Sequence, residues 1–303
     1  MSTAIKQPLI SLITVNYNQA RVTHELLQSL ETITYPNFEI WVVDNGSTAN
    51  PALTIDTKSY SFPIYLIKSE QNLGFAGGNN LALKKAKGDY IFLLNNDTEV
   101  TPDLLDKLLQ PFLQDKQVGV VCPKIKYYHK PNLIQYAGYS KMNYYTGRVF
   151  AHGSKQEDNG QHNQPGYTFG AHGAAMMLSR EVISTVGVFD ESYFLYYEEW
   201  DWSARIMKAG YKIYYQAEAT IYHKESVATG KNSPLKTYYL NRNRTLFILK
   251  NSSLPEKAFF LTYALALATP KAVISHIANK EFSHLKAYLK GWMWHINQKL
   301  GTL

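Results

Sequence analysis

The sequence contains little cysteine and lacks several familiar motifs. A single cysteine, Cys122, among 303 residues excludes an internal disulfide and a thiolate metal cluster. The N-terminus has no apolar segment followed by small residues, so no signal peptide is expected and the expected location is cytoplasmic. The first strand-like run lacks a following G-x-G-x-x-G, which excludes a dinucleotide-dependent oxidoreductase. No Gly-rich basic loop follows it either, which argues against a nucleotidyltransferase that must hold a triphosphate.

The sequence has fewer acidic than basic residues. There are 31 Lys and Arg against 24 Asp and Glu, a formal charge of +7, and acids are rare from Lys224 onward. This balance suits anionic partners, which include nucleic acids, phosphorylated small molecules and acidic membrane surfaces. The basic residues do not form a recognisable nucleic-acid-binding motif, so no nucleic-acid partner is expected.

The first 122 residues alternate between apolar, β-branched runs and segments with helical spacing. The expected strands are residues 8–18, 38–47, 62–69, 89–97 and 118–123. Strands that are apolar at nearly every position, separated by amphipathic helices, predict an α/β fold with a mostly parallel sheet covered on both faces. Ligands of such sheets bind at the carboxyl ends of the strands.

Four polar clusters fall at these strand ends: "NYN" (16–18), "DNGS" (44–47), "NLGFAGGNN" (72–80) and "NNDTE" (95–99). They are far apart in sequence but are predicted to line one cleft. Glycine-rich loops of this kind allow the backbone to approach phosphates and sugars closely. The candidate binding residues are Asn16, Asn18, Asp44, Asn45, Gly74, Phe75, Asn79, Asn95 and Asn96.

The pattern changes after residue 125. Short hairpins and a flexible loop at 154–165 are expected up to residue 170. A strand, a short helix, a second helix at 198–209 and two short strands should follow. Helices are expected from 233 onward, with breaks near Pro255 and Pro270.

The helix expected at 198–209 begins with three carboxylates in four residues. Helical spacing places Glu199 on the packed face with Trp202 and Ile206, whereas Glu198 and Asp201 fall on the other flank. A carboxylate aimed at a packed face needs a partner or a chemical role, so Glu199 is the candidate general base. Asp201 either pairs with Arg205 four residues later or takes part in catalysis.

One carboxylate and one histidine are the candidate metal ligands. Mg²⁺ or Mn²⁺ is often held by few protein groups together with the phosphates of a ligand. Asp97 supplies the carboxylate, and His223 or His172 supplies the imidazole. The alternatives are that Asn96 and Asp97 only shape a turn and that His223 is an ordinary surface residue.

The chain resembles bacterial family 2 glycosyltransferases, especially the rhamnosyltransferase-like branch. The resemblance covers residues 8–250 and rests on eight strings in register: "ITVNYN", "VVDNGS", "NLGFAGGNN", "FLLNND", "FGAHGAAMMLSR", "GVFDESYFLYYEEWDWSARIMKAGY", "IYHKES" and "YYLNRNR". It implies a GT-A fold and inverting transfer of a sugar from a nucleotide-diphosphate donor. It also implies a nucleotide-sugar-binding half (1–125), an acceptor-binding and catalytic half (126–232) and a helical extension (233–303).

The resemblance assigns roles to individual residues. Asp44 matches the aspartate that binds the nucleotide base, and Gly74, Phe75 and Asn79 lie in the donor loop. Asn95, Asn96 and Asp97 occupy the DxD position, with Asn95 in place of its first acid and Asp97 as the metal ligand. In "EEWD", Glu198 precedes Glu199, which matches the catalytic base, and His223 matches a metal-binding histidine of some members.

The expected substrates are a dTDP-rhamnose-like or UDP-sugar donor and a saccharide or lipid-linked acceptor of cell-surface polysaccharide synthesis. Because Asn95 replaces an acid, an inactive nucleotide-sugar-binding relative is the alternative. The apolar run Ala258–Thr269 is expected to be too short and interrupted to span a bilayer. It is either a core helix or, with Trp292 and Trp294 beside lysines, part of a peripheral contact of residues 257–303 with the inner face of the cell membrane.

Overall fold

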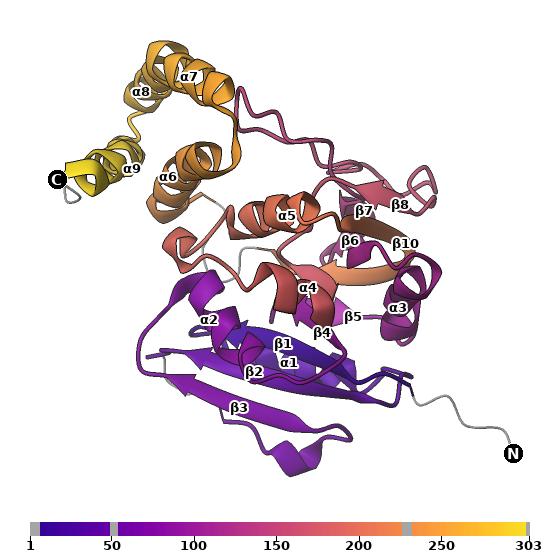
Figure 1. Cartoon of the computed structure of the whole chain (residues 1–303). Coiled ribbons are helices and arrows are strands. Elements are labelled where there is room, and N and C mark those ends of the chain that lie inside the picture. The colour runs from indigo at the N-terminus through magenta and orange to yellow at the C-terminus, as the bar shows by residue number, and fades with distance from the viewer. Residues whose placement is uncertain (1–6, 49–53, 226–231, 301–303) are drawn as a thin grey trace, which may run out of the picture.

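The computed structural model describes residues 7–48, 54–225 and 232–300. Within these residues the centre of the molecule is one ten-stranded mixed sheet in the order β3-β2-β1-β4-β9-β6-β10-β5, with β7 paired to β6 and β8 to β10. Figure 1 shows this sheet with β3 at one end of the molecule and helices α6 to α9 at the opposite end.

The first half of the sheet is parallel, as the sequence predicts. Its strands are β1 (Ile10–Asn16), β2 (Phe38–Asn45), β3 (Ile64–Ser69) and β4 (Tyr90–Leu94). They are connected through α1 (Ala20–Leu30), a short η1 turn (Thr57–Ser59) and α2 (Gly74–Leu83), and α2 packs on β1 and β2. Parallel pairing brings the carboxyl ends of all four strands to one edge, so the polar clusters that follow them meet there.

The second half of the sheet is mixed. β9 (Ala175–Ser179) lies antiparallel between β4 and β6 (Val118–Tyr127), and β10 (Lys212–His223) runs parallel to β6 and antiparallel to β5 (Thr98–Val100). The prediction of two short strands before residue 224 is wrong: β10 is one strand whose register shifts between Gln216 and Thr220, which a local bulge allows. The helices of this half are α3 (Leu104–Gln114), α4 (Arg180–Val186), a short η2 turn (Glu191–Tyr193) and α5 (Glu198–Lys208).

The segment 154–165 is held in place by buried charges. It follows the hairpin of β6 with β7 (Lys130–Tyr136) and precedes β8 (Gly166–Thr168). The carboxylate of Asp158 lies 3.2 Å from the ammonium of Lys124 and 2.8 Å from that of Lys126, and Lys124 is 3% exposed. A flexible loop was the expectation, but these ion pairs anchor the loop to β6.

The C-terminal part is helical. α6 (Pro234–Asn251) packs on α5 and α9 (Phe282–Leu300), and the break before α7 (Leu254–Tyr263) falls at Pro255 as predicted. The predicted break at Pro270 is wrong, because a wide π-helical turn at Ala264–Ala268 joins α7 to α8 (Thr269–Ala278) without interruption. Such a turn removes the clash between a proline ring and the preceding carbonyl groups.

The apolar tail forms one continuous helix, made of α7, the π-helical turn and α8. It runs for 25 residues from Leu254 to Ala278, and within the described part of the chain it is the one helix long and apolar enough to cross a membrane. Only 11% of its most apolar 18-residue stretch is buried inside the described structure. The expectation that this segment is too short and interrupted is therefore wrong, and its exposure contradicts a core helix.

Candidate active site

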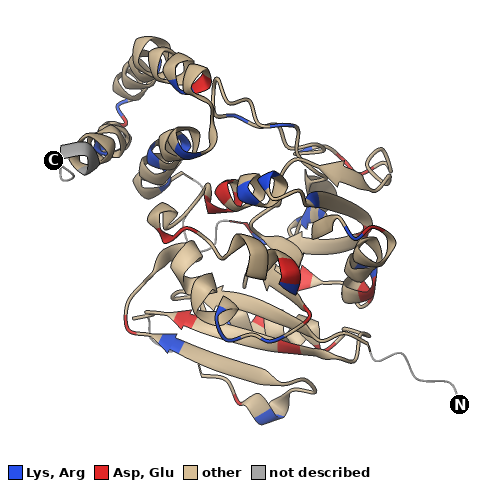
Figure 2. Cartoon of the chain, viewed as in Figure 1, with Lys and Arg blue, Asp and Glu red and all other residues tan. Residues whose placement is uncertain are grey.

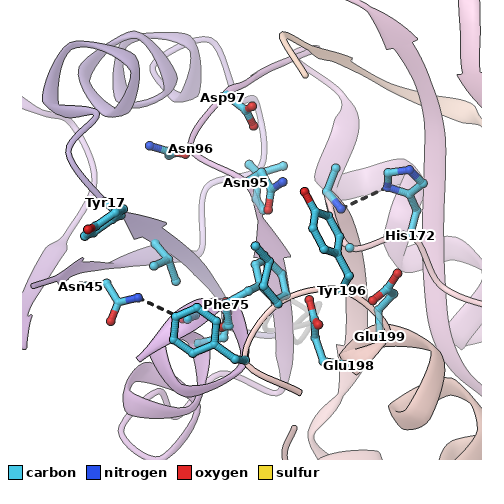
Figure 3. Close-up of a pocket in the computed structure, with 18 of the residues that line it drawn as sticks. Tyr17, Asn45, Phe75, Asn95, Asn96, Asp97, His172, Tyr196, Glu198 and Glu199 are labelled. Carbon is cyan, nitrogen blue, oxygen red and sulfur yellow. Dashed lines mark hydrogen bonds between the residues drawn. The ribbon is translucent and has the colours of Figure 1, made fainter. Parts of the chain in front are cut away.

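A cleft of about 390 Å³ opens at the carboxyl edge of the parallel strands. One side of it is lined by residues from all four predicted loops, namely Tyr17, Asn45, Asn72, Gly74, Phe75, Asn79, Asn95, Asn96 and Asp97. Figure 3 shows Asn45, Phe75 and Tyr17 on one side of this cleft and Glu198 and Glu199 on another. The prediction that distant loops form one cleft is confirmed.

Asn45 holds the glycine-rich turn that follows β3. Its side-chain amide donates to the Asn72 side-chain oxygen (3.1 Å) and the Gly74 carbonyl (2.9 Å), and its own oxygen accepts from the Leu73 N–H. Gly74 has φ +71°, and a Cβ there would lie 2.2 Å from the carbonyl oxygen of Phe194. Only glycine fits this position, so the turn brings bare backbone to the cleft. Asn79, 2% exposed, also lines the cleft and donates to the Phe75 carbonyl.

Asn16, Asn18 and Asp44 are not among the residues that line the cleft. The Asn16 amide donates to the Asp44 carboxylate (3.0 Å) and to the Ser47 hydroxyl (3.1 Å). The Asn18 side chain accepts from the Thr48 N–H at 2.8 Å. The structure thus brings these predicted binding residues together, and Asn16 fixes the orientation of the Asp44 carboxylate.

The two predicted metal ligands touch each other. The Asp97 carboxylate lies 3.0 Å from Nε2 of His223, and both residues are buried. Antiparallel pairing of β5 with β10 places His223 opposite Thr98, the neighbour of Asp97. Sequence spacing could not show this pairing, because 126 residues separate the two groups.

The donor set suits a divalent cation. Nδ1 of His223 lies 2.8 Å from Oε1 of Gln135, so an Nδ1–H donated to this oxygen leaves the Nε2 lone pair beside Asp97. Carboxylate and imidazole are both ligands of Mn²⁺, and carboxylate is the usual protein ligand of Mg²⁺. Among the described residues no group of three or more His, Cys, Asp or Glu is placed to hold a metal, so a cation here needs ligand oxygens from a substrate.

Glu198 and Glu199 occupy the first turn of α5, and both line the cleft. Burial raises the pKa of Glu199 from 4.5 to about 7, against backbone hydrogen bonds that lower it. Burial and the neighbouring Glu199 charge raise the pKa of Glu198 well above its ordinary value, and its Oε2 has no hydrogen-bond partner. A carboxylate that titrates near neutral pH fits a general base.

The prediction that Glu199 is the acid aimed at the packed face of this helix is wrong, because Glu199 is only partly buried. Glu198 is 4% exposed and Asp201 is 3% exposed, so the flank assigned to them is buried as well. The reason is that α6 packs against α5 there. The spacing within one helix could not reveal that a second helix, α6, packs on this flank.

Asp201 lies outside the cleft lining. Its carboxylate accepts from the guanidinium of Arg205 at 2.8 Å, from the Tyr193 hydroxyl at 3.2 Å and from the Asn251 amide at 2.9 Å. The i,i+4 ion pair is therefore present. The hydrogen bonds from Tyr193 and Asn251 tie α5 to the preceding turn and to α6. Of the two predicted roles for Asp201, the geometry favours the ion pair.

His172 forms another part of the cleft wall. Burial, followed by nearby His223, lowers its pKa to about 3, so the ring is neutral. Its Nδ1 accepts from the Ala174 N–H at 3.1 Å, which leaves Nε2 as the protonated nitrogen. The ring stacks on Tyr139 at an interplanar angle of 5°. His172 is consequently an oriented hydrogen-bond donor.

Six further lining residues with polar side chains escaped the sequence reasoning: Tyr17, Asn72, Tyr139, Tyr196, Glu225 and Lys236. Tyr17 and Asn72 stand inside the predicted loops and could have been named from their position. Tyr139 lies in the stretch without periodicity, and Lys236 belongs to the first turn of α6. No sequence signal places these two at the cleft.

Comparison with known proteins identifies the family. The model of "Glycosyl transferase family 2" matches residues 11–187, more than half of the chain. This chain belongs to glycosyltransferase family 2. The O-antigen biosynthesis protein RfbC of Myxococcus xanthus is 26% identical over 241 residues, 77% of this chain and 19% of RfbC. The chain spans between 19% and 37% of the length of the first curated relatives that it matches.

Solved structures share the fold at low sequence identity. The mannosyltransferase PcManGT of Pyrobaculum calidifontis, in complex with GDP-Man and Mn²⁺, is 18% identical with a TM-score of 0.56, covering 95% of this chain and 86% of that one. Residues 1–349 of Staphylococcus aureus TarS, in complex with UDP-GlcNAc, are 19% identical with a TM-score of 0.55, covering 92% and 79%. The predicted GT-A fold, with its helical C-terminal part, is confirmed.

Proposed function

We propose that the protein is an inverting glycosyltransferase that moves a sugar from a nucleotide-diphosphate donor to an acceptor hydroxyl. The observation that carries this proposal is Glu199, whose pKa of about 7 suits a base, in one cleft with the Asp97–His223 pair. The glycine-rich turn held by Asn45 borders the same cleft, on the side proposed for the donor. The family and the fold of nucleotide-sugar-bound neighbours support the proposal.

Glu199 removes the proton from the acceptor hydroxyl. The acceptor oxygen forms its bond to the anomeric carbon while the bond from that carbon to the diphosphate oxygen breaks, so the configuration inverts and a nucleoside diphosphate leaves. A divalent cation, Mg²⁺ or Mn²⁺, would be held by Asp97 and His223 and would balance the charge of the diphosphate. The Nε2–H of His172 is available to an oxygen of either substrate.

The remaining cleft residues bind and orient the donor. Gly74 and Phe75 line the donor side of the cleft, and Asn79 fixes this turn from within α2. Asn95 and Asn96 lie beside Asp97 and supply neutral hydrogen-bonding groups. Asp44, whose carboxylate is oriented by Asn16, is the proposed ligand of the nucleotide base beyond the lined part of the cleft, and Asn18 braces the same loop.

The donor is proposed to be a dTDP-rhamnose-like or UDP-linked sugar, and the acceptor a saccharide or lipid-linked saccharide. The O-antigen relative supports a role in cell-surface polysaccharide synthesis. A thermal-shift panel of nucleotide sugars with and without Mn²⁺ tests the donor class, because a ligand that binds only the folded state raises the melting temperature. One nucleotide sugar should stabilise the protein more than the others and more strongly with Mn²⁺. Stabilisation by none of them would contradict the proposal.

The second candidate is a nucleotide-sugar-binding relative without activity. It is favoured by Asn95, which supplies no charge to the Asp97–His223 pair. Hydrolysis of the best-bound donor separates the candidates. Turnover by the wild type and its loss in Glu199→Gln supports the transferase. Binding without any turnover supports the inactive relative.

We further propose that the C-terminal helices rest on the inner face of an acidic membrane. Leu265, Leu267 and Ile274 are 59%, 65% and 66% exposed on the continuous helix from α7 to α8. Residues 254–303 hold six lysines and two glutamates, and residues 301–303 lie outside the described part. Figure 2 shows acidic positions in this extension only at the start of α7 and between α8 and α9. Exposed apolar side chains beside lysines fit an anionic lipid surface.

Vesicle sedimentation tests the membrane contact. The wild type should co-sediment with phosphatidylglycerol-containing vesicles, and a triple Leu265→Ser, Leu267→Ser, Ile274→Ser variant should stay in solution with an unchanged melting temperature. The triple variant removes exposed apolar groups only, so it preserves the fold. If the wild-type protein does not co-sediment with these vesicles, the proposed membrane contact is wrong.

A further inference from the structure

The segment that leads into the catalytic helix is strained. Phe194, Tyr196 and Tyr197 have φ values of 62°, 67° and 72°, the left-handed region that residues with large side chains rarely adopt. Phe194, Leu195 and Tyr196 also line the cleft, and Tyr197 is the cap of α5 directly before Glu198 and Glu199. Strained backbone persists only where the surroundings hold it firmly. The groups that hold this segment therefore control where Glu199 lies.

Asn243, on α6, supplies most of the restraint. It is fully buried, and its single amide nitrogen lies 2.8 Å from the Tyr193 carbonyl, 2.7 Å from that of Leu195 and 2.7 Å from that of Tyr196. Three carbonyl groups of the same loop thus converge on one side-chain amide. None of these three carbonyls takes part in the proposed chemistry.

Arg242 completes the restraint from the same turn of α6. Its guanidinium donates to the carbonyls of Ser192 (2.5 Å) and Tyr193 (2.8 Å), and its Nε donates to the Asn243 oxygen at 2.7 Å. The Asn243 amide is therefore oriented by Arg242. Arg242 is itself covered by the Trp294 ring of α9, whose centroid is 4.6 Å from the guanidinium carbon.

We propose that Asn243 and Arg242 are positioning residues that hold segment 192–197 in its strained form and so aim Glu199 into the cleft, with Trp294 of α9 supporting Arg242. The helical extension is then part of the catalytic unit rather than an appendage. This inference rests on the proposed role of Glu199. It predicts that losing the contacts of Asn243 and Arg242 with this segment changes catalysis although no side chain that lines the cleft is substituted.

The test compares two asparagines of the same helix in the full-length protein. Asn243→Ala removes the contacts to the loop, whereas Asn241→Ala removes a buried amide that donates to the Tyr288 carbonyl of α9. Amide hydrogen exchange, measured without any ligand, should accelerate at residues 193–198 in Asn243→Ala and stay at the wild-type rate there in Asn241→Ala. Equal exchange of this segment in both variants would overturn the proposal.

The pH dependence of kcat is a second measurement, and a loss of stability alone would not change it. With the best-bound donor, Asn243→Ala should lower kcat by about 100-fold, because small displacements of a catalytic group cost this much. The apparent pKa of the activity should fall towards 4.5, since a loosened segment admits water to Glu199. Asn241→Ala should keep the wild-type pH profile. Equal losses of kcat with the same pH profile in both variants would overturn the proposal.

A milder change covers the case in which Asn243→Ala does not fold. Arg242→Lys keeps a cation under Trp294 but loses the forked contacts to Ser192 and Tyr193, so a drop in kcat of about tenfold is expected. Wild-type exchange and kcat in Arg242→Lys would contradict the role of Arg242. If Glu199→Gln keeps full activity, the proposed base fails instead, and the exchange measurement still decides whether Asn243 holds the loop.

Discussion

The two sides of the cleft are supported in different ways. On the donor side the strand-end loops brace one another: Asn45 bonds three groups of the turn 72–74, and Asn16 bonds the neighbouring loop at Asp44 and Ser47. On the catalytic side, segment 193–197 has three residues at positive φ and depends on Asn243, about 50 residues further along the chain. The donor side is supported by its own loops, whereas the catalytic side is supported by a distant helix and, at Phe194 alone, by the Phe75 N–H of the donor side.

This difference separates binding from catalysis. A locally braced edge keeps its shape whatever the helical extension does, so nucleotide binding should survive changes in α6 to α9. The catalytic segment should respond to such changes, because its strain is held by groups of α6. Substitutions on the two sides of the cleft should therefore have different effects on binding and on catalysis.

The largest effect is expected at Glu199. Glu199→Gln should lower kcat/KM by about 1,000-fold, within the range attributed to a general base, while the thermal shift caused by UDP and Mn²⁺ stays unchanged. Glu198→Gln is the matched control, because it makes the same exchange at the neighbouring carboxyl group, whose pKa is raised by burial and by the Glu199 charge. Steady-state rates of both variants measure this. A similar loss in Glu198→Gln would show that the two acids act as one unit.

The next largest effect is expected at the metal pair. Asp97→Asn should remove the extra stabilisation that Mn²⁺ gives to UDP binding and lower activity by about 100-fold, since one group that offsets developing charge is worth that much. Glu99→Gln is the control, because Glu99 pairs with Lys224 outside the cleft lining. Calorimetry of UDP with and without Mn²⁺ gives the answer. Binding by Asp97→Asn that still depends on Mn²⁺ would assign the cation to other ligands.

Sequence reasoning predicted the donor side well and the catalytic side less well, for a physical reason. Parallel pairing brings all strand ends to one edge, so reading Asn45 and Asp97 at strand ends was enough to place them in one cleft. The burial of Glu198 and Asp201 depends on α6, and the contact of Asp97 with His223 depends on the pairing of β5 with β10. Single-sequence patterns report one element at a time, so these tertiary contacts stayed hidden.

A smaller effect is expected from pH. The pKa of Glu199 is raised to about 7, so the base is ionised above pH 7 and kcat should fall about tenfold per pH unit below it. The same shift makes the native state bind more protons than the unfolded state between pH 4.5 and 7, so this group's contribution to stability falls as pH rises through that window. Glu199→Gln should therefore melt at a higher temperature than the wild type at pH 8. A flat activity profile from pH 5 to 8 would exclude Glu199 as the titrating base.

The smallest effect is expected from Asn45, and it tests the local support of the donor side. Asn45→Ala removes three hydrogen bonds of a buried side chain and should lower the free energy of unfolding by about 1–3 kcal/mol, measured by urea denaturation. Asn37→Ala, which removes one surface hydrogen bond just before β2, should change it by less than about 0.5 kcal/mol. Asn45→Ala should also weaken UDP binding, yet keep the pH dependence of kcat, because Asn243 still holds segment 193–197. If the pH profile moves with Asn45→Ala, the donor edge also positions Glu199, since the Phe75 N–H donates to the Phe194 carbonyl at 2.7 Å and would transmit the change.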